Sequence, residues 1–203
     1  MGSSFTTHLG IEEMATGEKS GTWGTISNFN WDIVDRTSAY TSVALSGTTH
    51  TLTVREASPG TGTENLQDGM YRVIKFTGAL GGNNTITVAP NTTKVFFIVD
   101  NATTDSGSSG PYSLIFSQGT GANVTVQNGK NAIIYCDGAG SGAAVVNAVA
   151  DLQLDTLECT GAAAIDGTLA LGGVTTFGAA AAFGGNTLTN FSEVANAATN
   201  TGT

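Results

Sequence analysis

The chain has 203 residues and a formal net charge of -9 at pH 7; 11% of its residues are charged and 28 are glycine. Globular domains have roughly 25% charged residues and about 7% glycine, so this composition favours β-structure with tight turns over helices. No Lys or Arg follows Lys130, and this acidic balance argues against nucleic acid as a partner.

We expect an all-β fold in three segments. Residues 1–41 form an anchor with one short helix, residues 42–150 an antiparallel β-sandwich or jelly-roll body, and residues 151–203 a Gly/Ala-rich, repetitive and intertwined β-shaft. The first 30 residues lack the continuous apolar core of a secretory signal. The apolar runs after Lys130 are too short and too interrupted to cross a bilayer, so membrane insertion is not expected.

The N-terminal segment is predicted to be a loop followed by one helix. Up to Thr25 there is no sustained hydrophobic period, and residues 12–14 suit at most one helical turn. The helix follows, with Ser27 as its N-cap. Its apolar residues fall near the spacing of one helical face: Ile26, Phe29, Ile33, Val34 and Tyr40. Because a helix of roughly 12 residues is marginal alone, that face needs a partner surface.

The two tryptophans of the chain, Trp23 and Trp31, lie in this segment. Large aromatic residues anchor protein–protein interfaces, but they anchor hydrophobic cores equally well, so both roles stay open for them. If the segment docks on another protein, the predicted docking residues are Trp23, Ile26, Phe29, Trp31 and Ile33.

The middle segment is predicted to form the β-body, because short β-prone runs alternate with turn clusters at the spacing of a sandwich or barrel. The runs are Ser42–Leu45, His50–Glu56, Tyr71–Thr77, Asn84–Ala89, Lys94–Asp100, Tyr112–Gln118, Asn123–Gln127 and Asn131–Cys136. Asn128-Gly129, between the last two runs, is the strongest hairpin signal. The run KVFFIVD is apolar almost throughout, which indicates either a strand buried on both sides or a strand inside a subunit interface.

The C-terminal segment repeats imperfectly in units of 11 or 12 residues that mostly end in glycine. A unit this short cannot bury its apolar side alone, so it must stack or intertwine. Glycine and alanine allow close approach at a crowded axis, which favours an intertwined multi-chain shaft; a flexible tail is the alternative. The predicted shaft positions are Leu154, Leu157, Leu169, Leu171, Phe177, Phe183 and Leu188.

No residue is predicted to be catalytic or to bind a cofactor or a metal. Cys136 and Cys159 lack a CxxC spacing and a nearby pair of histidines, and two buried thiols are favoured over a disulfide. The histidines, His8 and His50, belong to no metal or nucleophile motif. The glycines of residues 138–142 imitate a phosphate-binding spacing without the required strand-then-helix setting, and we interpret them as a hinge between body and shaft.

The segment ATGEKSGTWGTISNFNWDIVD (Ala15–Asp35) resembles the N-terminal virion-docking segment of tail fibre proteins in tailed bacteriophages, especially marine ones. The tightest match is Gly21–Gly24, which reads Gly-Thr-Trp-Gly. A looser match extends through Phe76–Leu80, Phe97–Asn101 and Asn128–Gly138, and so covers most of the first 150 residues. The resemblance implies a trimeric fibre whose N-terminus grips the virion and whose distal part reaches the host.

On this basis we expect a non-enzymatic virion fibre protein that forms a homotrimer and docks on virion tail or portal-proximal proteins. A host-surface receptor would be contacted through a distal region, and no recognisable distal tip follows the repeats. Two alternatives remain. In a capsid or tail decoration protein, the body would bind and the tail would be a linker. In a carbohydrate-binding module, exposed aromatic residues such as Tyr71 or Tyr112 would line one face.

Overall fold

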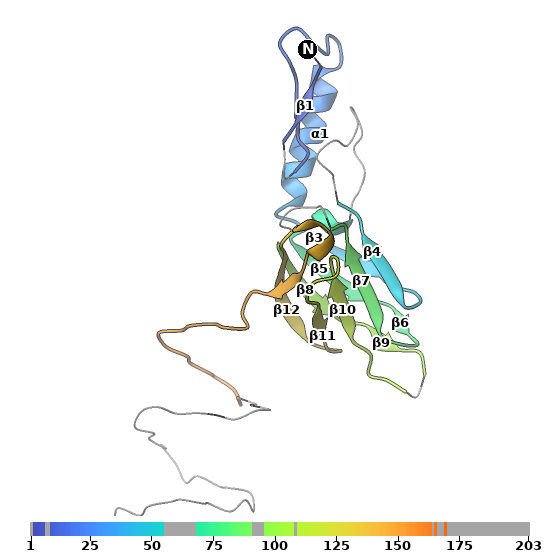
Figure 1. The fold of residues 1–203 in the computed structure, drawn as a ribbon, viewed down its shortest axis with the longest axis vertical. Helices are drawn as coiled ribbons and strands as arrows, with labels where there is room; N and C mark the ends of the chain where they lie inside the picture. The colour runs from blue at the N-terminus through green and yellow to red at the C-terminus, as the bar shows by residue number, and fades with distance from the viewer. Residues whose placement is uncertain are drawn as a thin grey trace, which may run out of the picture. The chain divides into compact units, whose positions relative to one another are not determined.

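A computed structural model describes residues 2–6, 9–54, 68–90, 96–107, 109–163, 165 and 169 (Figure 1). The chain divides into two units, Met1–Leu154 and Asp155–Thr203. The described part of the first unit contains one α-helix, and its other regular structure is almost entirely β (Figure 1). Its elements are β1 (Ser4–Phe5), β2 (Glu12–Glu13), α1 (Trp23–Arg36), β3 (Tyr40–Ala44), β4 (Thr49–Leu52), the 3-10 turn η1 (Asp68–Met70), β5 (Val73–Thr77), β6 (Ala79–Leu80), β7 (Asn84–Val88), β8 (Phe96–Asn101), β9 (Thr104–Asp105), β10 (Leu114–Ser117), β11 (Val124–Val126), β12 (Asn131–Cys136), the 3-10 turn η2 (Gly140–Gly142) and β13 (Val145–Asn147).

Each of the eight predicted β-prone runs overlaps an observed strand, so the mostly-β prediction is confirmed. The runs carry alternating apolar residues because one side of each strand faces the interior. In β5, for example, Ile74 and Phe76 are fully buried, whereas Val73, Lys75 and Thr77 are only partly covered.

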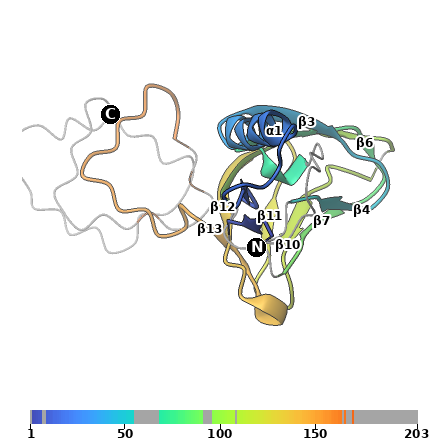
Figure 2. The same ribbon diagram turned by 90° about the horizontal axis from the view of Figure 1, so that it is seen from above.

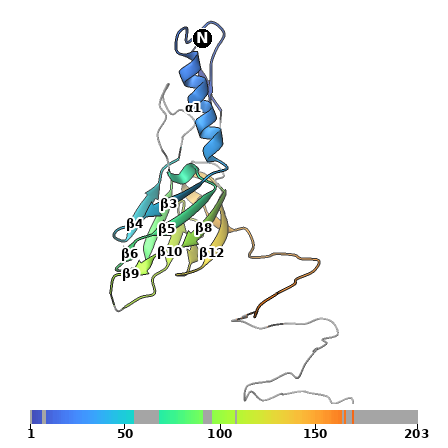
Figure 3. The same cartoon turned by 180° about the vertical axis from the view of Figure 1, so that it is seen from behind.

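Two main sheets make up the body, and both are built around parallel strands. The five-stranded sheet has the order β13-β12-β8-β5-β3, and the four-stranded sheet has the order β11-β10-β7-β4 (Figures 2 and 3). The pairs β3–β5, β5–β8, β4–β7 and β7–β10 are all parallel. The predicted antiparallel sandwich or jelly roll is therefore wrong at the centre of both sheets.

The physical reason is that the chain alternates between the two sheets. Three successive passes stack on one another: coil 1 (β3 and β4), coil 2 (β5 to β7) and coil 3 (β8 to β10). Short β6 and β9 also pair in parallel at the corner of coils 2 and 3. Each coil thus rests on its neighbour, as in a solenoid. Antiparallel β11, β12 and β13 then follow, β11 on β10 and β12 on β8, with β13 beyond β12.

The hairpin prediction at Asn128-Gly129 is also wrong. A turn is present, with Gly129 at a φ of 69°. The strands that it joins, β11 and β12, nevertheless belong to different sheets. The turn is fixed against coil 3 instead, because the Gly129 N–H donates to the carbonyl oxygen of Asn101 at 2.8 Å. A favourable turn dipeptide predicts a reversal of the chain, but not which strand the chain meets afterwards.

The glycines of residues 138–142 do not form a hinge. Asp137 Oδ1 accepts hydrogen bonds from the N–H groups of Ala139 and Ala144, both at 3.0 Å, and so fixes the turn at its two ends. The chain then returns as β13 beside β12. The body therefore continues through residues 145–147.

One hydrophobic core lies between the two main sheets. The rings of Phe76 and Phe116, from opposite sheets, meet edge to face with their centroids 5.6 Å apart. The core consists of Leu45, Leu52, Ile74, Phe76, Leu80, Ile86, Val88, Phe97, Val99, Leu114, Phe116, Val126, Ile134, Cys136 and Val145. Burial, followed by the nearby Asp137 charge, raises the pKa of Cys136 to about 12, so its thiol stays protonated near neutral pH.

Two details fix the packing of neighbouring elements in the body, one a hydrogen bond and the other a close approach of the backbone. The fully buried Asn101 lies next to Phe76 in the parallel ladder, and its Nδ2 donates to the carbonyl oxygen of Val126 at 3.0 Å. Gly78 has a φ of 114°, and its backbone passes so close to coil 1 that a Cβ there would collide with the carbonyl oxygen of Leu45. A side chain at this position would therefore separate coils 1 and 2.

The N-terminal segment differs from its prediction in two ways. Residues 12 and 13 form β2, which pairs antiparallel with β1, rather than a helical turn. α1 begins at Trp23 after Thr22, whose side chain makes no capping hydrogen bond to the helix, so Ser27 lies inside the helix and is not its N-cap. The preceding turn explains the early start, because the N–H groups of Thr22 and Trp23 both donate to the carbonyl oxygen of Lys19 at 2.9 Å.

The described residues of the second unit form no strand, and the β-shaft therefore stays a prediction. Leu157 and Leu169 are exposed, as is Leu154 at the end of the first unit. The other predicted shaft positions lie outside the described residues: Leu171, Phe177, Phe183 and Leu188. Cys136 is buried and Cys159 is exposed, and both are free, so the prediction of two buried thiols is wrong for Cys159. Within the described residues, no helix is long and apolar enough to cross a membrane.

Candidate docking surface on the N-terminal helix

One side chain of α1 attaches the helix to the β1–β2 hairpin, through two hydrogen bonds with the hairpin backbone. Asn30 Nδ2 donates to the carbonyl oxygen of Glu12 at 2.9 Å, and the Glu12 N–H donates back to Asn30 Oδ1 at 3.0 Å. The buried Glu12 carboxylate also forms an ion pair with Lys19, with Nζ and Oε1 at 3.1 Å. Glu12 therefore connects the hairpin to both the helix and the turn before it.

One face of α1 is covered by the chain itself. Ile26 and Ile33, two helical turns apart, are buried, and so is Arg36. Phe29 and Asn30 are half-buried beside them. Of the predicted docking residues, Ile26 and Ile33 thus hold the helix in place, because a contacting protein would not reach them without displacing the chain.

A second face of α1 is apolar and open. Trp23 and Trp31 are 64% and 70% exposed, and Val34 lies on the same side at the spacing of successive helical turns. A shallow hollow of about 270 Å³ adjoins them. It is lined by Ile11, Ser27, Asn30, Trp31 and Val34. The hollow is large enough to take a few side-chain atoms from another protein, while Trp31 stands at its rim.

The charges around this face have one sign. Asp35 is exposed on α1 one helical turn after Trp31, and Asp32 is exposed next to Trp31 in the sequence, at the flank of this face. The nearby basic groups are engaged or covered, since Lys19 pairs with Glu12 and Arg36 is buried. We call the surface of Trp23, Trp31, Val34, Asp32 and Asp35 the helix face. An apolar side chain flanked by basic groups would complement it.

Sequence reasoning identified the tryptophans of the helix face but missed its other half. Ile11 precedes β2, and Asn30 was not singled out. The alternation of a two-residue strand is too short to be recognised, so nothing in the sequence placed Ile11 beside the helix. The sequence does not indicate that Val34 is exposed and Ile33 is buried, because the two residues are adjacent and both are apolar.

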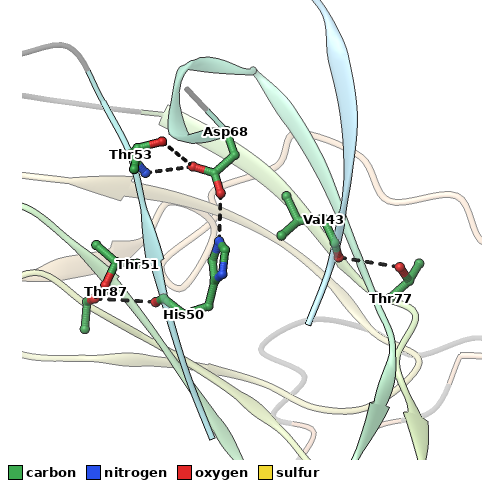
Figure 4. Close-up of polar contacts among 7 residues, drawn as sticks. All are labelled: Val43, His50, Thr51, Thr53, Asp68, Thr77 and Thr87. Carbon is green, nitrogen blue, oxygen red and sulfur yellow. Dashed lines mark hydrogen bonds and ion pairs between the residues drawn. The ribbon is translucent and has the colours of Figure 1, made fainter. Parts of the chain in front are cut away.

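Another polar cluster of the first unit surrounds His50 (Figure 4). His50 Nε2 and Asp68 Oδ2 are 2.7 Å apart, and Asp68 Oδ1 accepts hydrogen bonds from the N–H and hydroxyl of Thr53 at 2.7 and 2.9 Å. The hydroxyls of Thr51 and Thr87 bond to each other at 2.9 Å. These bonds connect β4 to η1 and to β7, which is a structural role.

Among the described residues, the contacts of His50 are those of this structural cluster. The other histidine, His8, lies outside the described residues. In the part of the chain that the structure describes, no three His, Cys, Asp or Glu side chains gather closely enough to hold a metal ion. Tyr71 and Tyr112, which a sugar-binding face would need exposed, pack against the hydrophobic core instead.

Comparisons with known proteins do not assign the chain to a family. The chain matches no protein-family model, no curated protein and no solved structure. Its function is therefore inferred from its residues and their arrangement.

Proposed function

We propose that the chain is a structural virion fibre protein of a tailed bacteriophage, which docks on the virion through its N-terminus and carries a fibre involved in host attachment. One observation supports the docking role most directly. The two tryptophans lie open on α1, whereas the helix is attached to its own chain through other residues, Ile26, Ile33 and Asn30. Their role as hydrophobic core, which the sequence left open, is thereby disfavoured.

The exposed tryptophans suit docking on energetic grounds. Large aromatic side chains bury about 150–250 Å² each and dominate interface energetics. At about 25 cal/mol per Å², covering much of Trp23 and Trp31 would contribute several kcal/mol to binding. Open apolar surface of this kind marks interaction sites in soluble proteins. The partner in this proposal is a virion tail or portal-proximal protein.

The tail of the chain fits the fibre proposal in a second way. Leu154, Leu157 and Leu169 are exposed in the single chain, so they are free to pack against equivalent residues of other copies. In the proposal three chains intertwine here, which gives a homotrimer with three anchors. Three linked anchors bind far more tightly than one, because the second and third contacts form at a high effective concentration.

The alternatives receive less support. A carbohydrate-binding module built on Tyr71 and Tyr112 is disfavoured, because both rings pack against the core. A capsid or tail decoration protein would use the body for binding, and would leave the exposed tryptophans without a role. The proposal is non-enzymatic, since the His50–Asp68 contact is used to join β4 to η1.

The docking role is tested by removing both indoles from the helix face. Virions carrying the Trp23→Ala, Trp31→Ala double variant should contain at least about tenfold less of the protein, because central aromatic residues dominate interface energies. Asn28→Ala, on an exposed part of the same helix, is the matched control and should be incorporated normally. Quantitative mass spectrometry of purified virions gives the readout. Normal incorporation of a correctly folded double variant would rule out docking through this face.

A further inference from the structure

The outer side of the five-stranded sheet carries a continuous apolar row. Tyr40 of β3 pairs in register with Val73 of β5, Val73 with Ile98 of β8, and Ile98 with Ile133 of β12. Tyr135 lies two residues beyond Ile133 on the same side of β12. We call these five residues the outer sheet face; β3, β5, β8 and β12 lie side by side in Figure 3.

This face is open although it is apolar. Tyr40, Ile98 and Tyr135 are 57%, 36% and 39% exposed. The residues on either side of Ile98, Phe97 and Val99, point inward and are fully buried. A sheet with one solvated side ordinarily alternates apolar and polar residues, whereas β8 is apolar on both sides at this level. Of the two explanations for the KVFFIVD run, burial on both sides within the described chain does not apply to Ile98.

A charged pair of opposite signs flanks the apolar row. Lys75 and Asp100 are direct neighbours in the ladder between β5 and β8, on the outer side and one step along the strands from Val73 and Ile98. Neither side chain forms an ion pair with another described residue, and both are partly exposed. A surface with an apolar centre and charges at its rim has the usual composition of a protein interface.

We infer that the outer sheet face is a contact between copies of this chain. Because the face presents a positive and a negative group side by side, Lys75 of one copy meets Asp100 of the next when two such faces pack about a symmetry axis. The helix face does not allow this, since a second copy would bring Asp32 and Asp35 against like charges. Assembly through the body is independent of virion docking and of the shaft.

A sugar is a weaker occupant for the same face. Sugar binding requires hydrogen-bonding side chains placed beside an exposed ring. Here the residues between Tyr40 and Tyr135 are the aliphatic Val73, Ile98 and Ile133, which suit close packing against another protein surface.

The first test is the solution mass of the full chain by light scattering over a range of concentrations. The wild-type chain should be an oligomer, and Ile98→Asp should lower the average mass by placing a carboxylate at the centre of the contact. Thr125→Asp is the control: it adds the same group to an exposed position of β11, in the other sheet, and should leave the mass unchanged. Circular dichroism confirms that both variants fold. A monomeric wild-type chain would overturn the inference.

The second test keeps the inference falsifiable if the tail alone can hold copies together. Unlabelled and ¹⁵N-labelled full chains are mixed, unfolded and refolded together, then treated with a carbodiimide, which joins contacting amines and carboxylates without a spacer. Peptides that link Lys75 to Asp100 should appear with one labelled and one unlabelled partner. These mixed links should reach at most about half of all such links in an evenly mixed sample, because Lys75 and Asp100 are also neighbours within one chain and link there with a single isotope. If every such link carries a single isotope while the chain is oligomeric, the copies meet elsewhere and the inference fails.

Discussion

Two open apolar surfaces of the first unit, the helix face and the outer sheet face, differ in the charges that surround them. The helix face has Asp32 and Asp35 beside its tryptophans, so a basic partner of another kind suits it. The outer sheet face has Lys75 and Asp100 together, so a second copy suits it. Apolar exposure alone marks both as contact surfaces, whereas the sign of the neighbouring charges separates binding to self from binding to another protein.

The two surfaces also differ in what supports them. The outer sheet face lies on strands whose inner sides contribute to the large core of the body. The helix face lies on 14 residues held by Ile26, Ile33 and the Asn30 contacts with β2. A helix of this length is marginal alone, so the anchor belongs to the less stable part of the unit. Mutations in the two supports should therefore have effects of different size.

The largest effect is expected from Phe76→Ala. Phe76 is fully buried between the sheets and contacts the ring of Phe116, so its removal should lower the free energy of unfolding by about 3–5 kcal/mol. Urea unfolding followed by circular dichroism measures the body. Tryptophan fluorescence, which comes from Trp23 and Trp31 alone, measures the anchor in the same sample. The exposed Thr125→Ala serves as control and should change the value by less than about 0.5 kcal/mol. A Phe76→Ala loss below about 1 kcal/mol would contradict the shared core.

A smaller effect is expected from Gly78→Ala, which breaks the contact between coils 1 and 2. The added Cβ meets the Leu45 carbonyl, and a φ of 114° is unfavourable for alanine, so the free energy of unfolding should fall by about 2 kcal/mol or more. Gly82→Ala is the matched control, because its Cβ would lie at an ordinary 3.8 Å from Thr48 Cγ2. Equal effects of the two substitutions, measured by thermal unfolding, would mean that the close approach at Gly78 does not hold the coils.

The sequence predicted the strands of this fold better than their connections. Alternation at Ile74 and Phe76 marks a strand whatever its direction, which is why the β-prone runs were found. Parallel stacking was missed because each strand pairs with the strand one coil away, at a separation of 25 residues for Val73 and Ile98, and no local signal encodes that choice. The turn dipeptide Asn128-Gly129 then suggested a hairpin where the chain in fact crosses between sheets.

The candidate docking site was predictable only in part for a similar reason. The tryptophans were predictable as docking residues because Trp is enriched at interfaces. Which side of the helix remains open depends on the β1–β2 hairpin, whose two-residue strands carry no detectable period. Ile33 and Val34 are adjacent and alike in chemistry, yet Ile33 is buried and Val34 is exposed. Contacts between residues far apart in the sequence therefore determine which side of α1 is exposed, and composition and periodicity do not encode those contacts.

The smallest effect is expected from Asn30→Ala, which removes the hydrogen bonds between α1 and the β1–β2 hairpin. Loss of the two hydrogen bonds with the Glu12 backbone should lower the stability of the anchor by about 1–2 kcal/mol, because a partly buried N–H and a carbonyl lose their partners. Asn28→Ala, at an exposed position of the same helix, should change it by only a few tenths of a kcal/mol. Tryptophan fluorescence should report the loss at lower urea than circular dichroism, since the body does not depend on these bonds. Coincident transitions shifted by the same amount would show instead that anchor and body unfold as one cooperative unit, and the proposed difference in support between the two surfaces would then fail.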